Sequence, residues 1–331
     1  MKAAWFEKKG PARDVMIVGE LPDPVPGAGQ VRVRVHVSGV NPSDTKTRGG
    51  WLGMTHMEFP RITPGQDGAG VIDRAGPGVP ESRIGERVWI YEAYIGRPFG
   101  TTAEYVVVPS ENAVTLPQTV DFDTGAGLGV PAMTSHRCLF ADGPIHGRTI
   151  LVQGGGGGVG HAAIQLASWA GARVIATVSR PEQEKTARQA GAAVIINRRT
   201  DNVVEAVRAA THGQGVDRII EVAFDENIQA DSAMLKTGGV ISAYSAGPTP
   251  QIPIPFFSFL RNNNAVQVVL VYTMGMQAHR DAIRDVTACL EAGRYRTHVG
   301  ARFPLDQIAD AHEAQDSGKV VGKIVIDLAT A

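Results

Sequence analysis

The segment 151–160 reads LVQGGGGGVG, so that five consecutive glycines follow an apolar run and precede an alanine-rich stretch with helical spacing. Gly155, Gly157 and Gly160 fit G-x-G-x-x-G, and Gly154, Gly157 and Gly160 fit an overlapping three-residue spacing. A missing Cβ lets a pyrophosphate approach the main chain or a helix pack closely on a strand. The N-terminus of the following helix offers free N–H groups to an anion. The run predicts a dinucleotide-binding loop; tight packing alone is the alternative interpretation.

The residues after the next apolar run indicate which dinucleotide is bound. An acid at the end of the second strand would hydrogen-bond the adenosine ribose of NAD. Here the segment ATVSRPEQEK places Ser179 and Arg180 at that point, and Lys185 follows; Arg198 and Arg199 come after the third strand. A hydroxyl and a guanidinium suit a 2′-phosphate, which an acid would repel. The pattern favours NADPH, although Lys185, Arg198 and Arg199 would each also serve as solvated surface charges.

The elements that position these residues form an α/β pattern. Nearly continuous apolar runs alternate with helix-compatible segments from about residue 123 onwards, which predicts a parallel, doubly wound sheet. The runs that we expect to be strands are 148–154, 172–178, 192–197, 216–223 and 238–245.

The first 120 or so residues have a different composition, which is rich in glycine, proline and β-branched residues. In 30–40, QVRVRVHVSGV, the valines alternate and share one face of a predicted strand. Short apolar runs separated by turn residues predict a compact β domain, a small barrel or sandwich. The run 322–328 follows a helical pattern at 306–318, and we expect it to return to this first domain.

Composition narrows the class of partner. The chain has 331 residues, which favours two domains, and a formal net charge of -1, which argues against a nucleic-acid surface. Two cysteines, Cys138 and Cys289, cannot form a disulfide framework. The sequence shows neither a signal peptide's apolar region nor a membrane span. A cytoplasmic protein with a small-molecule partner is the expectation.

Motifs along the whole chain resemble the zinc-free quinone oxidoreductases, the zeta-crystallin-like branch of the medium-chain dehydrogenase/reductase superfamily. Besides the glycine loop they include GVNPSDTKTRGG, PGQDGAGVI, GERVW, AEYVVVP, GAGLGVPAMTSHRCLF, INRR and GKIVI. The resemblance implies a GroES-like β domain built from both chain ends and a Rossmann domain inserted between them. The boundaries that we expect are 1–124 for the GroES-like substrate domain, 125–265 for the Rossmann NADPH-binding domain and 266–331 for the return.

The resemblance also implies positions for site residues. It places Asn41 near the nicotinamide and substrate. Thr134 would lie beside the nicotinamide ribose or be an ordinary helix-interior threonine, and Lys323 would reach the 2′-phosphate. The remaining cofactor-binding residues that we expect are Gly155, Gly156, Gly157, Gly158, Val159, Gly160, Ser179, Arg180, Lys185, Arg198, Asp225, Tyr244, Ser245, Ala246, Leu270, Val271 and Tyr272.

The zinc ligands of alcohol dehydrogenases in this superfamily have no match here. Asn41 and Gln66 stand where a cysteine and a histidine would bind the catalytic zinc, and the four structural cysteines are missing. No histidine has a ligand spacing such as H-x-x-x-H. We expect no metal, and hydride transfer that the cofactor largely performs itself.

Three functions remain open on the sequence. The leading hypothesis is NADPH-dependent reduction of a quinone. Reduction of an activated C=C bond, in an enal, enone or enoyl substrate, uses the same hydride geometry but needs a proton donor such as Tyr94, Tyr105 or Tyr272. An NADPH- or RNA-binding protein without catalysis, as among zeta-crystallin relatives, is the alternative from another class.

Two further features lead to expectations of their own. Lys46 stands where relatives often have a tyrosine at the pocket mouth, so it either favours an acidic acceptor or is solvated on its long stem. We treat it as a candidate substrate residue. The apolar segment 251–260, QIPIPFFSFL, is either core or the surface through which Rossmann domains pair in a homodimer.

Overall fold

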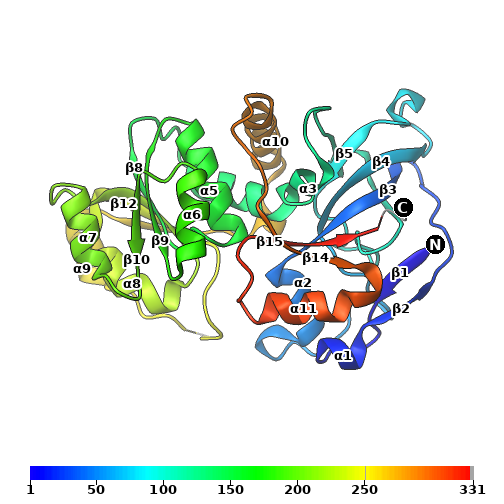
Figure 1. Cartoon of the computed structure of the whole chain (residues 1–331), viewed down its shortest axis with the longest axis horizontal. Coiled ribbons are helices and arrows are strands. Elements are labelled where there is room, and N and C mark those ends of the chain that lie inside the picture. The colour runs from blue at the N-terminus through cyan, green and yellow to red at the C-terminus, as the bar shows by residue number, and fades with distance from the viewer. Residues whose placement is uncertain (250, 329–331) are drawn as a thin grey trace. The chain divides into compact units, whose positions relative to one another are not determined.

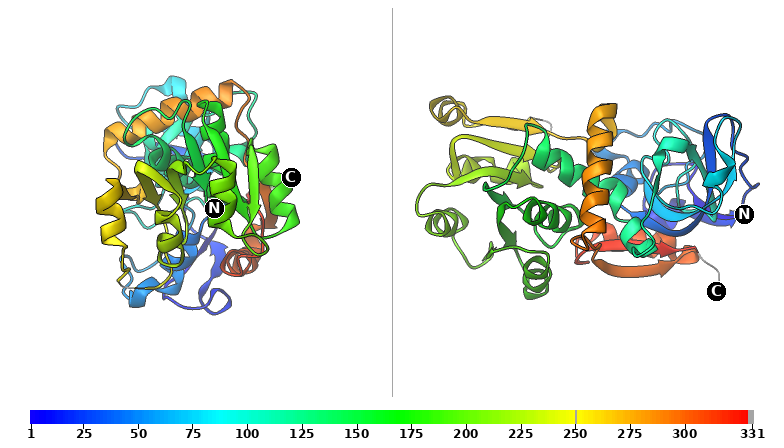
Figure 2. Two further views of the ribbon diagram at one scale, coloured as in Figure 1. Left: turned by 90° about the vertical axis from the view of Figure 1, so that its left-hand side faces the viewer. Right: turned by 90° about the horizontal axis from the view of Figure 1, so that it is seen from above.

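The computed structural model describes residues 1–249 and 251–328, which form two compact units (Figures 1 and 2). Unit 1 contains Met1–Val130 and the segment that starts at Arg296, and unit 2 contains Pro131–Tyr295. Both ends of the chain therefore contribute to unit 1. The boundaries lie at 130/131 and 295/296, whereas the sequence placed them at 124/125 and 265/266.

The later second boundary has a structural reason. Strand β13 (Ala265–Val268) pairs in parallel with β12 (Leu235–Ala243). Helix α10 (Met276–Glu291) packs against α4 (Met133–Phe140), which belongs to unit 2. These contacts hold the segment after residue 265 in unit 2, and the chain returns to unit 1 only after α10.

Unit 1 is built on a seven-stranded sheet with the order β14-β15-β3-β4-β5-β7, in which β6 also pairs with β3. A separate hairpin-like sheet joins β1 and β2. The strands of the unit are β1 (Lys2–Trp5), β2 (Ile17–Glu20), β3 (Gln30–Val40), β4 (Asp67–Ala75), β5 (Arg87–Ile90), β6 (Tyr105–Pro109), β7 (Ala113–Thr115), β14 (Val299–Pro304) and β15 (Lys323–Asp327).

The alternating valines of β3 form the core of this unit only in part as expected. Val31, Val33 and Val35 pack in the main core, but the pairing of β3 with β4 shifts register between Val35 and Val37. Val37 therefore packs in a second cluster, with Ala126 and Val325. The β15 strand pairs antiparallel with β3, so the C-terminal run does return to the first domain.

Helix α2 (Pro42–Gly49) carries candidate site residues of unit 1. It starts immediately after β3, at Asn41, whose backbone N–H donates to Asp44 Oδ2 at 2.8 Å. Pro42 occupies the first helical position, and Gly50 ends the helix with a φ of 81°. The other helices of this unit are α1 (Ala12–Val15), α3 (Phe122–Gly125) and α11 (Ile308–Asp316), with 3₁₀ turns at Trp51–Gly53, Glu81–Arg83, Ser110–Asn112 and Leu305–Gln307.

Unit 2 is a doubly wound parallel sheet with the order β10-β9-β8-β11-β12-β13. Numbered within the unit this is 3-2-1-4-5-6, the dinucleotide-binding order, in which ligands bind at the carboxyl ends where the order reverses, between β8 and β11. The strands not yet bounded are β8 (Thr149–Val152), β9 (Arg173–Val178), β10 (Val194–Asn197) and β11 (Val216–Glu221). The five predicted strands are present, and β13 is a sixth that the sequence did not predict.

Helices connect these strands (Figure 1). Between β8 and β9 runs α5 (Gly158–Trp169), which begins inside the glycine run. The remaining helices of unit 2 are α6 (Pro181–Gln189), α7 (Val203–Ala210), α8 (Phe224–Ser232) and α9 (Phe256–Asn262), with a π-helical turn at Leu128–Ala132 that leads into the unit and a 3₁₀ turn at Val271–Thr273. Among the described residues, no helix is both long enough and apolar enough to cross a membrane.

Candidate functional site

The glycine run lies at the point where the strand order of unit 2 reverses, between the end of β8 and the start of α5. Gly154 adopts a φ of +71°, and its N–H donates to Thr177 Oγ1 at 3.0 Å. A Cβ on Gly160 would come 2.2 Å from the carbonyl oxygen of Gly154. These two glycines make the turn and let α5 pack on the loop.

Gly157 has neither role. It is exposed, directly precedes α5 with a φ of −87°, and a Cβ there would meet nothing closer than the Gly154 oxygen at 3.5 Å. Nothing within the protein excludes a side chain at this position. The turn falls on Gly154 and the helix packing on Gly160, the first and third positions of the second overlapping pattern, and its middle position, Gly157, is the one that leaves room for a ligand.

The neighbouring glycines support the loop by packing. A Cβ on Gly155 would lie 3.0 Å from Ile164 and 3.1 Å from Ala176, and one on Gly156 would overlap Gln183 at 2.4 Å. Gly158 and Val159 form the first turn of α5, where backbone N–H groups have no partner inside the helix. This turn is the part of the loop that can hold an anion.

The predicted 2′-phosphate residues come together at the ends of β9 and β10. Arg198 Nε donates to Ser179 Oγ at 2.9 Å, although the two residues are 19 positions apart. Ser179 N–H donates to Gln183 Oε1 at 2.8 Å, which holds the turn into α6. Arg180 precedes α6 and is partly exposed, and Lys185 lies exposed on that helix. Ser179 and Arg198 thus form one polar cluster at the edge where the strands end.

The segments expected beside the nicotinamide follow β12 and β13. Tyr244 N–H donates to the carbonyl of Glu221 at 3.1 Å, and Phe224 N–H to the carbonyl of Ser245 at 3.2 Å. Burial raises the pKa of the Tyr244 phenol well above its usual value. Ala246 is partly buried against the core. After β13, Leu270 is exposed, Val271 is buried and Tyr272 is intermediate.

Asp225 fixes the loop that follows Ala246. Its carboxylate accepts from Gly247 N–H at 2.8 Å and from Thr249 Oγ1 at 3.3 Å. The hydrogen bond from Gly247 is the main cause that lowers the pKa of this carboxyl. Thr134 is buried in α4, at 5% exposure, which agrees better with a helix-interior threonine than with a ribose contact.

Beside the glycine loop lies a buried polar network of which the sequence pattern gives no sign. Thr177 Oγ1 donates to Gln153 Oε1 at 2.7 Å, and Gln153 Nε2 donates to Asp231 Oδ1 at 3.0 Å. Asp231 and Glu221 are both fully buried, and among the described residues Asp231 Oδ2 and Glu221 Oε2 have no hydrogen-bond partner. Burial, and next the charge of Glu221, raise the pKa of Asp231 to about 9. Asp231 therefore retains its proton at neutral pH.

This network predicts an alkaline loss of stability. Folding raises the pKa of Asp231, so its contribution is fully present below the ordinary carboxyl pKa and is lost as the pH rises towards 9. We expect the free energy of unfolding of unit 2 to fall between pH 6 and 9, by up to about 1.4 kcal/mol per pH unit. Asp231→Asn should remove that slope, because an amide keeps the hydrogen bonds without titrating. Thermal unfolding followed by circular dichroism measures it.

The matched control is Asp217→Asn, which changes a partly exposed acid of the same unit that pairs with Lys236 at 2.9 Å. This variant should keep the slope of the wild type. A wild-type protein equally stable across the whole range would contradict the protonated state of Asp231.

In unit 1, Asn41 belongs to a buried cluster with Asp67 and Lys323. Asn41 Nδ2 donates to Asp67 Oδ1 at 2.8 Å, and Lys323 Nζ donates to Asn41 Oδ1 at 2.5 Å. Lys323 Nζ also lies 3.1 Å from both oxygens of Asp67. The amide of Asn41 is thereby fixed, with its oxygen towards the ammonium and one N–H towards the carboxylate.

Lys323 is placed differently from what the resemblance implied. Its side chain is 3% exposed and its ammonium is committed to Asp67 and Asn41. A basic group that binds a phosphate must be able to leave such a pair, at a high cost for a buried acid. The structure therefore gives Lys323 an internal role in unit 1 and argues against a contact with the 2′-phosphate.

The same cluster tests whether zinc fits. The positions of the first two catalytic ligands hold Asn41 and Gln66, and an ammonium stands beside Asn41. An amide and a cation do not make a zinc site. Among residues 1–249 and 251–328, no group of three His, Cys, Asp or Glu side chains is arranged to hold a metal ion.

The tyrosines considered as proton donors differ in their surroundings. Tyr94 is buried and its hydroxyl donates to Asp44 Oδ1 at 2.9 Å. The ring of Tyr105 is covered by the guanidinium of Arg32 at 4.5 Å. Burial comes first among the causes that raise the pKa of Asp44, to about 6. Lys46, on α2, stands over the ring of Trp51 with its ammonium 4.0 Å from the ring centroid.

Comparisons with known proteins agree with this geometry. Residues 27–118 match the alcohol dehydrogenase GroES-like domain, and residues 158–291 match the family described as zinc-binding dehydrogenase. The quinone oxidoreductase of Rattus norvegicus is 31% identical over 97% of this chain and 95% of its own length. A 2-haloacrylate reductase from Burkholderia is 30% identical over 98% of each chain. Among solved structures, a mycobacterial protein complexed with NADPH has a TM-score of 0.86 and 25% identity, over 99% of this chain and 100% of that one.

Proposed function

Since the chain belongs to the quinone oxidoreductase branch of the medium-chain dehydrogenase/reductase superfamily, we propose that it is an NADPH-dependent reductase of quinones that works without zinc. The observation that carries the proposal is the Ser179–Arg198 pair at the ends of β9 and β10, in the same unit as the glycine loop. A hydroxyl and a guanidinium together suit a phosphate dianion.

Different residues would bind the cofactor and orient the acceptor in this reaction. Bound NADPH supplies a hydride from its nicotinamide, and a quinone with that hydride and one proton from solvent gives a hydroquinone. The first turn of α5 would hold the pyrophosphate where Gly157 leaves room, and Ser179 and Arg198 would hold the 2′-phosphate. Asn41, its amide fixed by Lys323 and Asp67, would offer its second N–H to a carbonyl oxygen of the acceptor.

A second candidate is reduction of an activated C=C bond, which the similarity to a 2-haloacrylate reductase favours. That reaction needs a proton at the carbon next to the activating group. The hydroxyl of Tyr94 is engaged with Asp44, and Tyr272 follows β13 at the strand ends. Parallel assays of NADPH oxidation by neutral naphthoquinones and by enals separate the two reactions.

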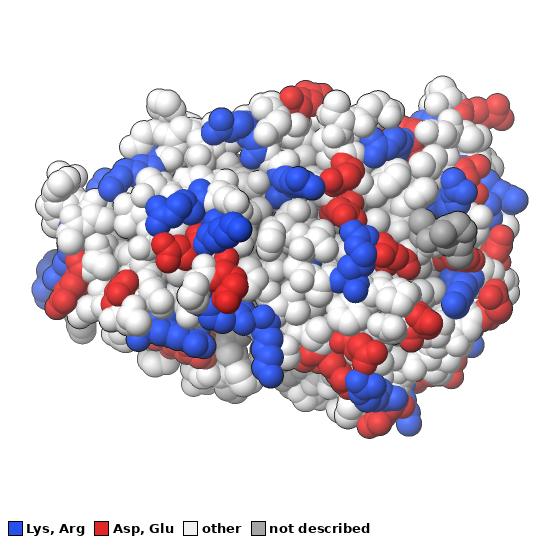
Figure 3. All heavy atoms as spheres, in the orientation of Figure 1, with Lys and Arg blue, Asp and Glu red and all other residues white. Residues whose placement is uncertain are grey.

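The surface charge supports an enzyme over an RNA-binding protein. On the face drawn in Figure 3, Lys and Arg side chains are interspersed with Asp and Glu. The formal net charge of the chain is -1. Binding to a polyanion depends on a concentrated basic surface, which this face does not present.

The cofactor preference is tested at Arg198. We expect Arg198→Ala to lower the ratio of NADPH to NADH affinity at least tenfold, because the 2′-phosphate loses a charge-assisted hydrogen bond. Fluorescence titration of both dinucleotides measures the ratio, with Arg180→Ala beside it. Arg188→Ala, which removes an exposed arginine that pairs with Glu184 on α6, is the matched control and should leave the ratio unchanged. An unaltered ratio in Arg198→Ala would remove the support for NADPH.

We also propose a homodimer through the edge of unit 2. β13 is an edge strand, and Val268 on it is 79% exposed. Phe256, Phe257 and Leu260 of α9 are exposed as well, whereas Phe259 is buried, so the segment 251–260 is only partly core. Exposed apolar side chains beside an open strand edge favour pairing of two copies.

The homodimer predicts a change of mass. Val268→Lys should convert the protein to monomers, because it puts a charge into the strand pairing. Analytical ultracentrifugation measures the mass, and Val25→Lys, a change at an exposed valine of unit 1, serves as the control. A wild-type protein that sediments as a monomer at all concentrations contradicts the proposal.

A further inference from the structure

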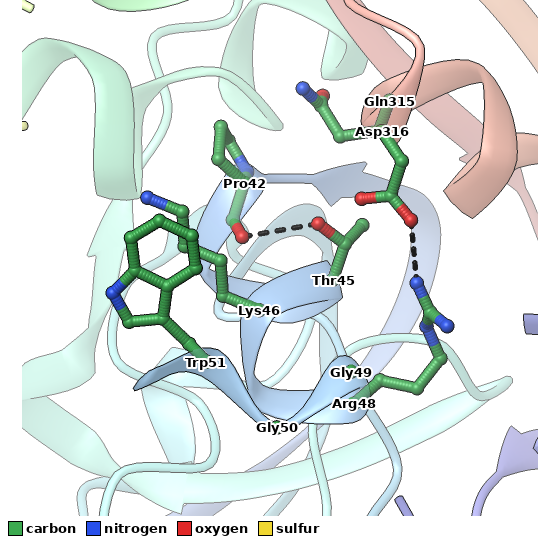
Figure 4. Close-up of a pocket in the computed structure, with 9 residues that line it drawn as sticks. All are labelled: Pro42, Thr45, Lys46, Arg48, Gly49, Gly50, Trp51, Gln315 and Asp316. Atoms are coloured by element: carbon green, nitrogen blue, oxygen red, sulfur yellow. Dashed lines mark hydrogen bonds and ion pairs between the residues drawn. The ribbon is translucent and has the colours of Figure 1, made fainter. Parts of the chain in front are cut away.

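Unit 1 contains a pocket of about 540 Å³ next to α2 (Figure 4). It lies between α2 with the following 3₁₀ turn on one side and the end of α11 on the other. Its volume is in the range of small-molecule sites. The side chains in its wall that have polar atoms or an aromatic ring are those of Thr45, Lys46, Arg48, Trp51, Gln315 and Asp316.

The charges in this wall do not cancel. Arg48 Nη2 donates to Asp316 Oδ2 at 2.6 Å, and Arg48 Nη1 donates to the carbonyl of Gly10 at 2.5 Å. The single acid in the wall is therefore neutralised by Arg48. Lys46 adds a second cation, and among the described residues it has no carboxylate partner.

Lys46 is partly withdrawn from water. Burial lowers the pKa of its ammonium, and the face of Trp51 is the contact that the structure gives it, at 4.0 Å. A cation–π contact compensates only part of the lost hydration of an ammonium. An anion in the pocket would restore the missing charge contact, as a charge-assisted hydrogen bond.

The rest of the pocket wall is flat and carries few side chains. Gly49 and Gly50 contribute no side chains, and Pro42 and the indole of Trp51 present rigid surfaces (Figure 4). Thr45 Oγ1 donates to the carbonyl of Pro42 at 3.2 Å, so its donor is already used. Such a wall accommodates a planar group, and the amide of Gln315 adds a neutral polar contact.

The position of Lys46 relates the pocket to the proposed reaction. Asn41 precedes α2, and Lys46 follows five residues later, about 7.5 Å further along the helix axis and about 140° around it. Asn41 is not part of the pocket wall, so the pocket would hold the acid group of an acceptor and not its reducible bond.

The geometry points to a planar, carboxylate-bearing acceptor whose acid group binds Lys46 in this pocket. The inference rests on the proposed function, because it names a class of acceptor for the proposed reductase. It also goes beyond that function, since an uncharged quinone makes no use of the ammonium.

The test uses two ligands that cannot be reduced by NADPH. 2-Naphthoate and 2-naphthamide have the same shape and differ in charge, and each is titrated calorimetrically into the full chain with excess NADPH. We expect the acid to bind at least tenfold tighter than the amide, and Lys46→Gln to erase this preference. Lys8→Gln, which removes an exposed lysine of the same unit, is the matched control and should keep it. Trp51→Leu should weaken both ligands equally.

Two outcomes overturn the inference: equal affinity for acid and amide in the wild type, or an unchanged preference in Lys46→Gln. Oxidation of NADPH by menadione, an uncharged naphthoquinone, keeps the two proposals apart. If the protein reduces menadione but binds 2-naphthoate no tighter than 2-naphthamide, the proposed function is supported and the proposed ligand of the pocket is wrong. If the protein prefers the acid through Lys46 but reduces no acceptor, the proposed ligand of the pocket is supported and the proposed reductase activity is wrong.

Discussion

Replacing Gly157 by valine is expected to raise the dissociation constant of NADPH at least a hundredfold, which is about 2.7 kcal/mol of binding free energy. A valine fits the protein at this position, because φ is −87° and the nearest atom to a new Cβ lies at 3.5 Å. The added methyl groups would stand where a pyrophosphate meets the first turn of α5. The loss therefore falls on the ligand and not on the fold.

Gly275→Val is the control for this substitution. Gly275 also directly precedes a helix of unit 2, α10, and its φ and ψ of −69° and 156° are similar to the −87° and 166° of Gly157. A Cβ there meets nothing within 4 Å. Both variants should lose a similar, small amount of thermal stability, about 1 kcal/mol or less, and only Gly157→Val should lose NADPH. Calorimetric titration with NADPH and thermal unfolding give the two values; undiminished binding by Gly157→Val would mean that no ligand uses this turn.

The second large effect is expected from Lys323→Met. Removing the ammonium leaves the carboxylate of Asp67, which is 0% exposed, without its cation. Breaking one side of a buried ion pair typically costs about 3–5 kcal/mol. We expect the free energy of unfolding of unit 1 to fall by that amount, measured by urea denaturation followed through tryptophan fluorescence, to which the buried Trp89 of unit 1 contributes.

Two comparisons make this result specific. Arg13→Met, which removes the cation of an exposed pair with Asp310, should cost about 0–1 kcal/mol. Combining Lys323→Met with Asp67→Asn should restore part of the lost stability, because the isolated charge disappears. If Lys323 instead reached the 2′-phosphate, Lys323→Met would abolish the preference for NADPH over NADH and leave unit 1 nearly as stable as before.

The parts of the structure that the sequence predicts are those encoded locally. The apolar runs 148–154 and 172–178 became β8 and β9, and the glycine spacing indicated the turn between strand and helix. The choice between the two overlapping glycine patterns was not local. It depends on the φ of Gly154 and on how closely α5 approaches it, and only the folded loop supplies both.

The features that the sequence analysis placed wrongly or did not predict depend on partners distant in the sequence. In GKIVI both faces of the strand are buried, so alternation cannot show that Lys323 points inwards; its direction is decided by Asp67, 256 residues away. The β13 strand is short, and its assignment to unit 2 follows from pairing with β12. Likewise, Asp231 looks like an ordinary surface acid of a helix until Glu221 and Gln153 are placed beside it.

The discontinuity of unit 1 has a consequence during synthesis on the ribosome. Strand β15 lies between β14 and β3, so the sheet stays incomplete until almost the whole chain has emerged. At 5–20 residues per second, the 256 positions between Asp67 and Lys323 take roughly 13 to 50 s to translate. Throughout that interval Asp67 has no Lys323 with which to pair, while the whole of the contiguous unit 2 is synthesised. Strand β3 of the nascent chain therefore has an unpaired edge until β15 has been synthesised.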